Sequence, residues 1–258
     1  MTARPRTVIV TGASRGIGRA TALRLAQDFG LVVVVARSGG DLADTADQIR
    51  AAGARALAIP QDLRVADAAA RVVTAVMAEA GGIDAIVNIA GAVPQADLLT
   101  MTDAQWDDGL ALKFHGARRL ATQGWPHLRA SRGSLIFMSG ATAVAPKAML
   151  AGVSAINAAI SGLAKAFADR GLADDVQVNT ILPGAVMTGR RLAMIEHFAA
   201  TRGLVLREAM LVYAREAGIS RFGQPEDIAA LIAFALSPAA RWMTGSSLRM
   251  DGGETKSL

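Results

Sequence analysis

The chain has 258 residues, of which 52% are hydrophobic and 19% charged, with a formal net charge of +5 and no cysteine. This length and apolar content predict one domain with a large buried core. The absence of cysteine excludes disulfides and thiolate metal sites.

Positive charge is spread along the chain, without a basic run of five or more residues and with few aromatic residues beside the arginines and lysines. This pattern predicts a solvated surface and no nucleic-acid partner. Apolar runs such as 31–36 and 228–236 are too short to span a bilayer, and residues 1–6 lack the apolar core of a signal peptide. The three histidines stand alone and predict no metal site. We therefore expect a cytoplasmic protein without a membrane partner.

Short apolar runs alternate with stretches of helical periodicity along the chain. The predicted strands are 7–10, 31–36, 54–59, 84–89, 134–138, 176–182 and 247–250. The predicted helices are 19–26, 41–52, 65–76, 102–120, 154–170 and 225–236. The unbroken apolar run 31–36 is typical of a parallel strand buried on both faces. The alternation predicts an α/β fold, a doubly wound parallel sheet with helices on both faces.

The stretch 11–18 reads TGASRGIG and lies between the first strand and the first helix. Glycine lets a ligand approach bare backbone N–H groups, and a helix N-terminus suits a phosphate. The spacing of Gly12, Gly16 and Gly18 is GxxxGxG, which differs from the commoner GxGxxG of dinucleotide sites. A tight strand-to-helix turn that binds no ligand needs only one glycine. The three glycines of this loop therefore favour a bound phosphate.

Residues after the other strands fit the same ligand, because ligands of such sheets bind beyond the carboxyl ends of the strands. Arg37 stands where an acid would bind the ribose 2′-hydroxyl, and with Arg15 it favours NADP over NAD. The alternative is that both arginines are solvated surface residues. This alternative is stronger for Arg15 than for Arg37. The predicted cofactor site comprises Gly12, Ser14, Arg15, Gly16, Ile17, Gly18, Arg37, Asp62, Leu63, Asn88, Ala90, Gly91, Pro183, Gly184, Val186 and Thr188.

These stretches resemble the short-chain dehydrogenase/reductase family over essentially the whole chain. Besides the glycine loop, 88–91 (NIAG), 178–184 (VNTILPG) and 244–253 are similar to family elements. The resemblance implies one Rossmann domain over 1–258 with a seven-stranded sheet and a substrate lid at 187–218. It also implies a homodimer or homotetramer that transfers a hydride between NAD(P) and an alcohol or carbonyl substrate.

The resemblance further implies catalytic Asn, Ser, Tyr and Lys residues, and the chain departs from the family at all four positions. Alignment through flanking residues puts Lys113 at the Asn position and Asn157 at the Lys position. It puts Gly140 at the Ser position and Val153 at the Tyr position. The single tyrosine of the chain, Tyr213, lies in the lid region. Because valine cannot donate a proton, we expect the usual proton relay to be absent.

Lys113 and Asn157 have exchanged their family positions, so the ammonium group could reach the same pocket from the opposite helix. A partly desolvated lysine can have a lowered pKa and serve as an acid. The candidate catalytic residues are Lys113, Ser139, Ser154 and Asn157. In the lid region, polar side chains that could contact a polar or anionic substrate are Arg190, Arg191, Glu196 and His197, although solvated surface residues are the favoured interpretation.

Three functions follow from this sequence. The first is an NADP(H)-dependent oxidoreductase that acts on an apolar carbonyl or alcohol with a non-standard proton donor. The second is a nucleotide-binding protein without redox turnover, either a cofactor sensor or a structural partner. The third is a lyase or isomerase that reuses the pocket.

Overall fold

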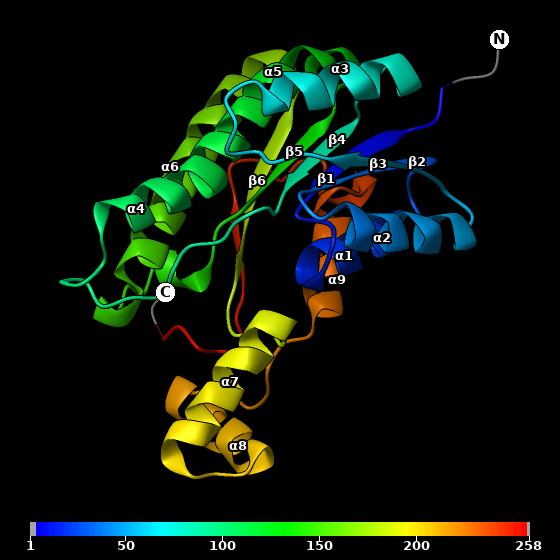
Figure 1. Ribbon diagram of the computed structural model, residues 1–258. Helices are drawn as coiled ribbons and strands as arrows, with labels where there is room; N and C mark the ends of the chain where they lie inside the picture. Colours follow the sequence, from blue (N-terminus) through cyan, green and yellow to red (C-terminus); the bar gives the residue numbers. More distant parts are fainter. Residues whose placement is uncertain (1–3, 257–258) are drawn as a thin grey trace.

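A seven-stranded parallel sheet forms the centre of the molecule in the computed structural model, which describes residues 4–256 (Figure 1). The strands are β1 (Thr7–Thr11), β2 (Leu31–Ala36), β3 (Arg55–Pro60), β4 (Ala85–Asn88), β5 (Ser134–Met138), β6 (Gln177–Pro183) and β7 (Ser247–Met250). Their order is β3-β2-β1-β4-β5-β6-β7, and each neighbouring pair is parallel. The order changes direction between β1 and β4, which is where such sheets bind their ligands.

Helices cover both faces of the sheet, as predicted. They are α1 (Gly16–Leu25), α2 (Gly39–Ala51), α3 (Ala68–Ala80), α4 (Asp103–Gly109), α5 (Ala117–Ser131), α6 (Ala151–Asp174), α7 (Gly189–Arg202), α8 (Leu206–Ala217) and α9 (Pro225–Ala235). A π-helical segment, η1 (Leu110–Gly116), joins α4 to α5. Three short 3₁₀ segments are η2 (Ala141–Ala143), η3 (Ala148–Leu150) and η4 (Pro238–Ala240).

Alternate side chains of the central strands enter different cores. Ile9 and Val33 pack with α3, α5 and α6 on one face, whereas Val8 and Val32 pack with α1, α2 and α9 on the other. Successive side chains of a strand point to opposite faces, so a strand covered on both sides needs apolar residues at every position. This arrangement confirms the interpretation of the run 31–36.

Several predicted boundaries differ from the structure. Val65 was expected on a helical face, but it is 47% exposed and precedes α3. The Asp62 carbonyl oxygen accepts from the Val65 backbone N–H, which forms a turn there instead of a helix. The helix predicted over 102–120 begins with a capping box of Thr102 and Gln105, a pair with the spacing that such a box requires, but it continues through the π segment to Ser131.

Helix α6 is longer than predicted. By length and composition alone, residues 148–174 could cross a membrane, which the short apolar runs did not indicate. In the fold, Ile160, Ala164 and Ala168 of α6 pack against the sheet in the core.

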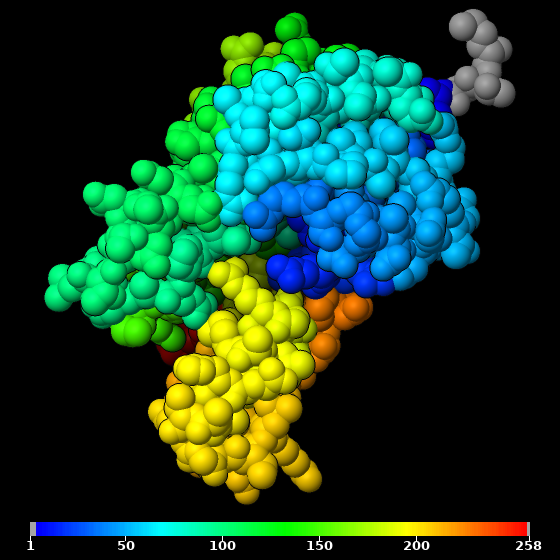
Figure 2. Space-filling model, in the orientation of Figure 1, coloured from blue at the N-terminus to red at the C-terminus, as the bar shows by residue number. Residues whose placement is uncertain are grey.

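The predicted lid region forms a helical hairpin of α7 and α8 that stands out from the body of the molecule (Figures 1 and 2). Its two helices enclose a small apolar cluster of their own, separate from the two cores beside the sheet, to which Ile195, Ala209 and Phe222 belong.

Candidate active site

The loop between β1 and α1 has the backbone geometry that its glycines predict. Gly12 has a φ of +68°, and a Cβ there would lie 3.0 Å from the Ala90 backbone. A Cβ on Gly18 would collide with the Gly12 carbonyl oxygen. In the described part of the chain, no side chain caps the N-terminus of α1. The loop therefore presents free backbone donors at a positive helix end, which suits a phosphate.

The ends of β4 and β6 lie against this loop. The Thr11 hydroxyl oxygen accepts from the backbone N–H groups of Ile89, at 2.9 Å, and Ala90, at 3.0 Å. A Cβ on Gly16 would meet the Thr188 side chain at 3.3 Å. Three separate segments predicted to bind the cofactor are thus packed together at the carboxyl edge of the sheet.

Asn88 ends β4 with a buried side chain whose amide oxygen and nitrogen have no hydrogen-bond partner among residues 4–256. A buried amide without partners costs free energy, so such a group indicates a ligand. Together with the glycine loop and the uncapped α1, Asn88 fits a bound dinucleotide.

The predicted cofactor-site residues after β2 and β3 differ in exposure and in their contacts. Arg37 follows β2 and is exposed. A hydrogen bond from Arg64, with further help from the charge of Arg37, lowers the pKa of Asp108. Asp62 accepts from the Arg64 backbone N–H at 3.0 Å. Leu63 is 4% exposed, and its side chain packs in the core.

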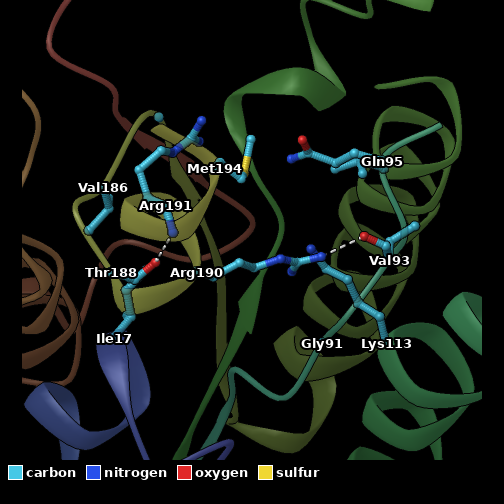
Figure 3. Close-up of a pocket in the computed structure, with 12 residues that line it drawn as sticks. Ile17, Gly91, Val93, Gln95, Lys113, Val186, Thr188, Arg190, Arg191 and Met194 are labelled. Carbon is cyan, nitrogen blue, oxygen red and sulfur yellow. Dashed lines mark hydrogen bonds between the residues drawn. The ribbon is translucent and has the colours of Figure 1, made fainter. Parts of the chain in front are cut away.

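A cavity of about 190 Å³ lies beside the glycine loop (Figure 3). It is lined by Ile17, Gly91, Val93, Gln95, Lys113, Val153, Gly184, Val186, Thr188, Arg190, Arg191 and Met194. One cavity is therefore lined by predicted cofactor-site residues, by Lys113 and by the first turn of α7. Of the lid residues considered from sequence, Arg190 and Arg191 line it, whereas Glu196 and His197 are exposed and do not.

Lys113 projects into this cavity from the π segment η1. Its ammonium group donates to the Ser139 carbonyl oxygen at 3.2 Å and to Asn157 Oδ1. Asn157 in turn donates from Nδ2 to the Thr142 hydroxyl at 2.9 Å, which fixes the amide with its oxygen toward Lys113. Burial of the ammonium group, followed by repulsion from Arg190, lowers the pKa of Lys113 to about 8. Lys113 can therefore hold or release a proton near neutral pH.

The two candidate serines lie behind the cavity wall. The Ser139 hydroxyl is buried, donates to the Asn157 carbonyl oxygen at 2.8 Å and accepts from Ser161 at 3.0 Å. The Ser154 hydroxyl is buried with no partner among the residues described. Of the four candidate catalytic residues, Lys113 alone lines the cavity, and Ser139 and Asn157 hold it in place.

The positions that the family resemblance assigns to Ser and Tyr also lie here. A Cβ on Gly140 would lie 2.6 Å from Asn157 Nδ2, so the Asn157 amide fills the space that a side chain at 140 would need. Val153 lines the cavity. Tyr213 does not line it and instead accepts a hydrogen bond from Arg191 at 2.6 Å.

Sequence reasoning missed Thr142, Ser161 and Gln95, and it missed the π-helical turn. Thr142 and Ser161 carry no motif and become relevant only through their contacts with Asn157 and Ser139. π-Helical turns are frequent at functional sites, but no residue pattern in 110–116 announces one.

The chain is similar to known proteins over almost its whole length. The family described as enoyl-(acyl carrier protein) reductase matches residues 12–255. The short-chain reductase protein NovJ of Streptomyces niveus is 36% identical over 245 residues, which cover 95% of this chain and 92% of NovJ. The 3-oxoacyl-[acyl-carrier-protein] reductase FabG of Staphylococcus aureus is 30% identical, with 96% of this chain and 97% of FabG covered.

A similar solved structure is L-sorbose reductase of Gluconobacter frateurii, complexed with NADPH and L-sorbose. It superposes with a TM-score of 0.94 at 29% identity, and the match covers 100% of this chain and 99% of the reductase.

Proposed function

Because the chain belongs to the short-chain dehydrogenase/reductase family, we propose that it is an NADP(H)-dependent oxidoreductase acting on a carbonyl or alcohol, with Lys113 as proton donor. The observation that carries this proposal is the ammonium group of Lys113, held in the cavity beside the glycine loop with a pKa of about 8. The similar proteins support the redox class, since NovJ and FabG are named reductases and L-sorbose reductase is complexed with NADPH.

The cofactor would be held by the edge of the sheet described above. Backbone donors of the glycine loop would bind the pyrophosphate, Thr188 a phosphate or the carboxamide, and Arg37 the 2′-phosphate. When bound, NADPH supplies the hydride that reduces the carbonyl carbon. The protein has to supply the proton for the carbonyl oxygen.

Lys113 holds that proton. Its ammonium group has three donors, and the contacts with the Ser139 carbonyl oxygen and Asn157 Oδ1 use two of them. The third can be directed into the cavity toward a substrate oxygen. Asn157 and Ser139 are positioning residues, because they orient Lys113 and do not line the cavity. The lid hairpin would close one side of the substrate site through Arg190, Arg191 and Met194.

A second candidate is a protein that binds NADP(H) without turnover, as a sensor or structural partner. The observation that favours it is Val153, an apolar side chain in the cavity at the position where the family resemblance places a tyrosine.

Two measurements separate these candidates. We expect NADPH binding, followed by the change in nicotinamide fluorescence, and NADPH consumption with at least one member of a broad carbonyl panel. Binding without consumption across the panel would favour the second candidate. No binding would contradict both.

Replacing Arg37 with Ala is expected to weaken NADPH binding about 10- to 100-fold, which is the value of one or two charge-assisted hydrogen bonds. NADH lacks the 2′-phosphate, so its affinity is expected to stay unchanged and serves as the internal control. Fluorescence titration with both cofactors measures the effect. An equal loss for NADPH and NADH would show that Arg37 does not bind the 2′-phosphate.

We also propose a homodimer or homotetramer. One flank of α6 is exposed and lined by small residues, Ala155, Ala158, Ala159, Gly162 and Ala166, which let a second helix approach closely. On the β7 side of the sheet, Trp242 is 100% exposed and Phe234 50% exposed, which suits a second interface.

A Gly162→Arg substitution distinguishes an interface from a free surface. A side chain at Gly162 would contact nothing within 4 Å in the single chain, so the variant is expected to fold. At a helix interface the arginine would bury an unpaired charge, and light scattering is expected to show the dimer mass falling to that of one chain. Gly40→Arg is the matched control, because a side chain there also meets nothing within 4 Å and α2 lies elsewhere. An unchanged mass for Gly162→Arg would rule out this interface.

A further inference from the structure

Positive charge is concentrated around the cavity without a compensating acid. Its lining residues include Lys113, Arg190 and Arg191 and no carboxylate. Among residues 4–256, none of these three forms an ion pair within 4 Å. Like charges at close range repel one another, so this arrangement is unfavourable until an anion enters. The lining therefore indicates an anionic ligand.

Arg190 is the cation that extends across the cavity. Its side chain reaches from the first turn of α7 to the segment after β4, where Nη2 donates to the Val93 carbonyl oxygen at 2.7 Å (Figure 3). Burial, and then the neighbouring guanidinium groups of Arg191 and Arg15, lower the pKa of Arg190. Arginine has five N–H donors, and among the described residues the contact with Val93 uses one. The others remain for a ligand.

Arg191 is directed away from Arg190. Its Nη1 donates to the Tyr213 hydroxyl at 2.6 Å, and its guanidinium group lies 5.5 Å from the centre of the Tyr213 ring. These contacts fix Arg191 to α8 of the lid hairpin, so Arg190 is the arginine placed to meet a molecule that also reaches Lys113.

The proposed function implies a carbonyl substrate beside Lys113, and the following inference rests on it. We propose that this substrate is a small carbonyl compound carrying a carboxylate, and that Arg190 binds the carboxylate while Lys113 contacts the carbonyl oxygen. A planar guanidinium group matches a carboxylate through two parallel hydrogen bonds, which fixes orientation as well as charge.

The size and the remaining walls of the cavity restrict the substrate further. Pockets for drug-sized ligands have volumes of about 300–1,000 Å³. This cavity of about 190 Å³ also includes walls assigned above to the cofactor, namely Ile17, Gly184 and Thr188. The other apolar lining residues include Val93, Val153 and Met194, which suit a short hydrocarbon chain. The lining therefore favours short oxo acids, of which 2-oxo and 3-oxo acids are the ones to test.

An anion at Arg190 could also be a phosphate of the cofactor, and the experiment has to separate the two sources. We would compare the protein with its Arg190→Gln and Arg190→Lys variants, and with Arg207→Gln, an exposed arginine of α8 outside the cavity lining, as the matched control. Turnover would be measured on pairs of short 2-oxo and 3-oxo acids and their methyl esters. NADPH affinity, and calorimetric binding of oxamate to the NADP⁺-loaded protein, would be measured for each variant.

We expect kcat/KM to be higher for the acid than for its ester. Arg190→Gln should lower kcat/KM for the acid about 10- to 100-fold, lower it much less for the ester, and abolish oxamate binding. Arg190→Lys should recover part of the loss, and Arg207→Gln should show none. NADPH affinity should not change.

Two results would overturn the inference and leave the proposed reductase in place. One is equal rates on acid and ester, and the other is a loss of NADPH affinity in Arg190→Gln that accounts for its lower rate. Oxamate binding that depends on Arg190, without reduction of any acid or ester, would support the anion site and contradict the reductase.

Discussion

A Lys113→Met variant is expected to reduce carbonyl substrates about 10²- to 10⁴-fold more slowly, the range by which a positioned general acid accelerates a reaction. Methionine keeps an unbranched side chain of similar length and removes the ammonium group. NADPH affinity is expected to be unchanged, because the glycine loop and Arg37 are intact. Steady-state kcat and a fluorescence titration measure the two quantities.

The control is Lys165→Met, which removes an exposed lysine from α6 whose ammonium group donates to the Gly245 carbonyl oxygen at 3.1 Å. It should keep full turnover. If Lys113→Met keeps both turnover and cofactor affinity, Lys113 is not the proton donor.

The pH dependence gives a second check of the same role. Only the protonated ammonium group can donate, and the pKa of Lys113 is about 8. The rate of carbonyl reduction should therefore be constant below that pH and fall as the pH rises through it, whereas alcohol oxidation should rise over the same range. Arginine stays protonated throughout, so a fall in reduction rate that persists unchanged in Lys113→Arg would have another cause.

A Gly12→Ala variant is expected to lose NADPH affinity at least about 10-fold, since one charge-assisted hydrogen bond from the loop is worth that much. At its φ of +68°, alanine is strained, and its Cβ would press on the Ala90 backbone at 3.0 Å. The loop would have to move, and its N–H groups would no longer converge on the pyrophosphate.

Gly81→Ala provides a matched control for backbone strain. Gly81 ends α3 with the same φ of +68°, but a Cβ there would meet nothing within 4 Å. Both variants should lose about 1–2 kcal/mol of unfolding free energy in urea titrations, the cost of a left-handed alanine. Only Gly12→Ala should lose NADPH binding. Equal NADPH affinities for the two variants would mean that the loop does not hold the phosphate.

The sequence predicts the fold well because the determining signals are local. Residues 31–36 are apolar at every position, and β2 is covered on both faces. Thr102 and Gln105 have the spacing of a capping box, and they form one. The three glycines at 12, 16 and 18 predict a loop without side chains before the first helix, and at Gly12 this loop lies against the Ala90 backbone after β4.

The candidate site is less predictable, because it depends on contacts between distant segments. Nothing in the local sequence shows that the Ser139 hydroxyl bonds to the α6 backbone, or that Asn157 fills the space beside Gly140. The π turn that carries Lys113 likewise has no residue signature. Val65 fits helical periodicity, but the turn after Asp62 excludes it from α3.

The α7–α8 hairpin has a consequence for how this scaffold can diversify. Because its apolar cluster is separate from the two cores beside the sheet, changes within the hairpin leave most of the stabilising contacts of the chain untouched. The same hairpin contributes Arg190, Arg191 and Met194 to the cavity. If the cavity binds the substrate as proposed, mutations that alter substrate preference can accumulate in the hairpin with little loss of global stability, and the hairpin is then the segment to exchange between related proteins when a new preference is sought.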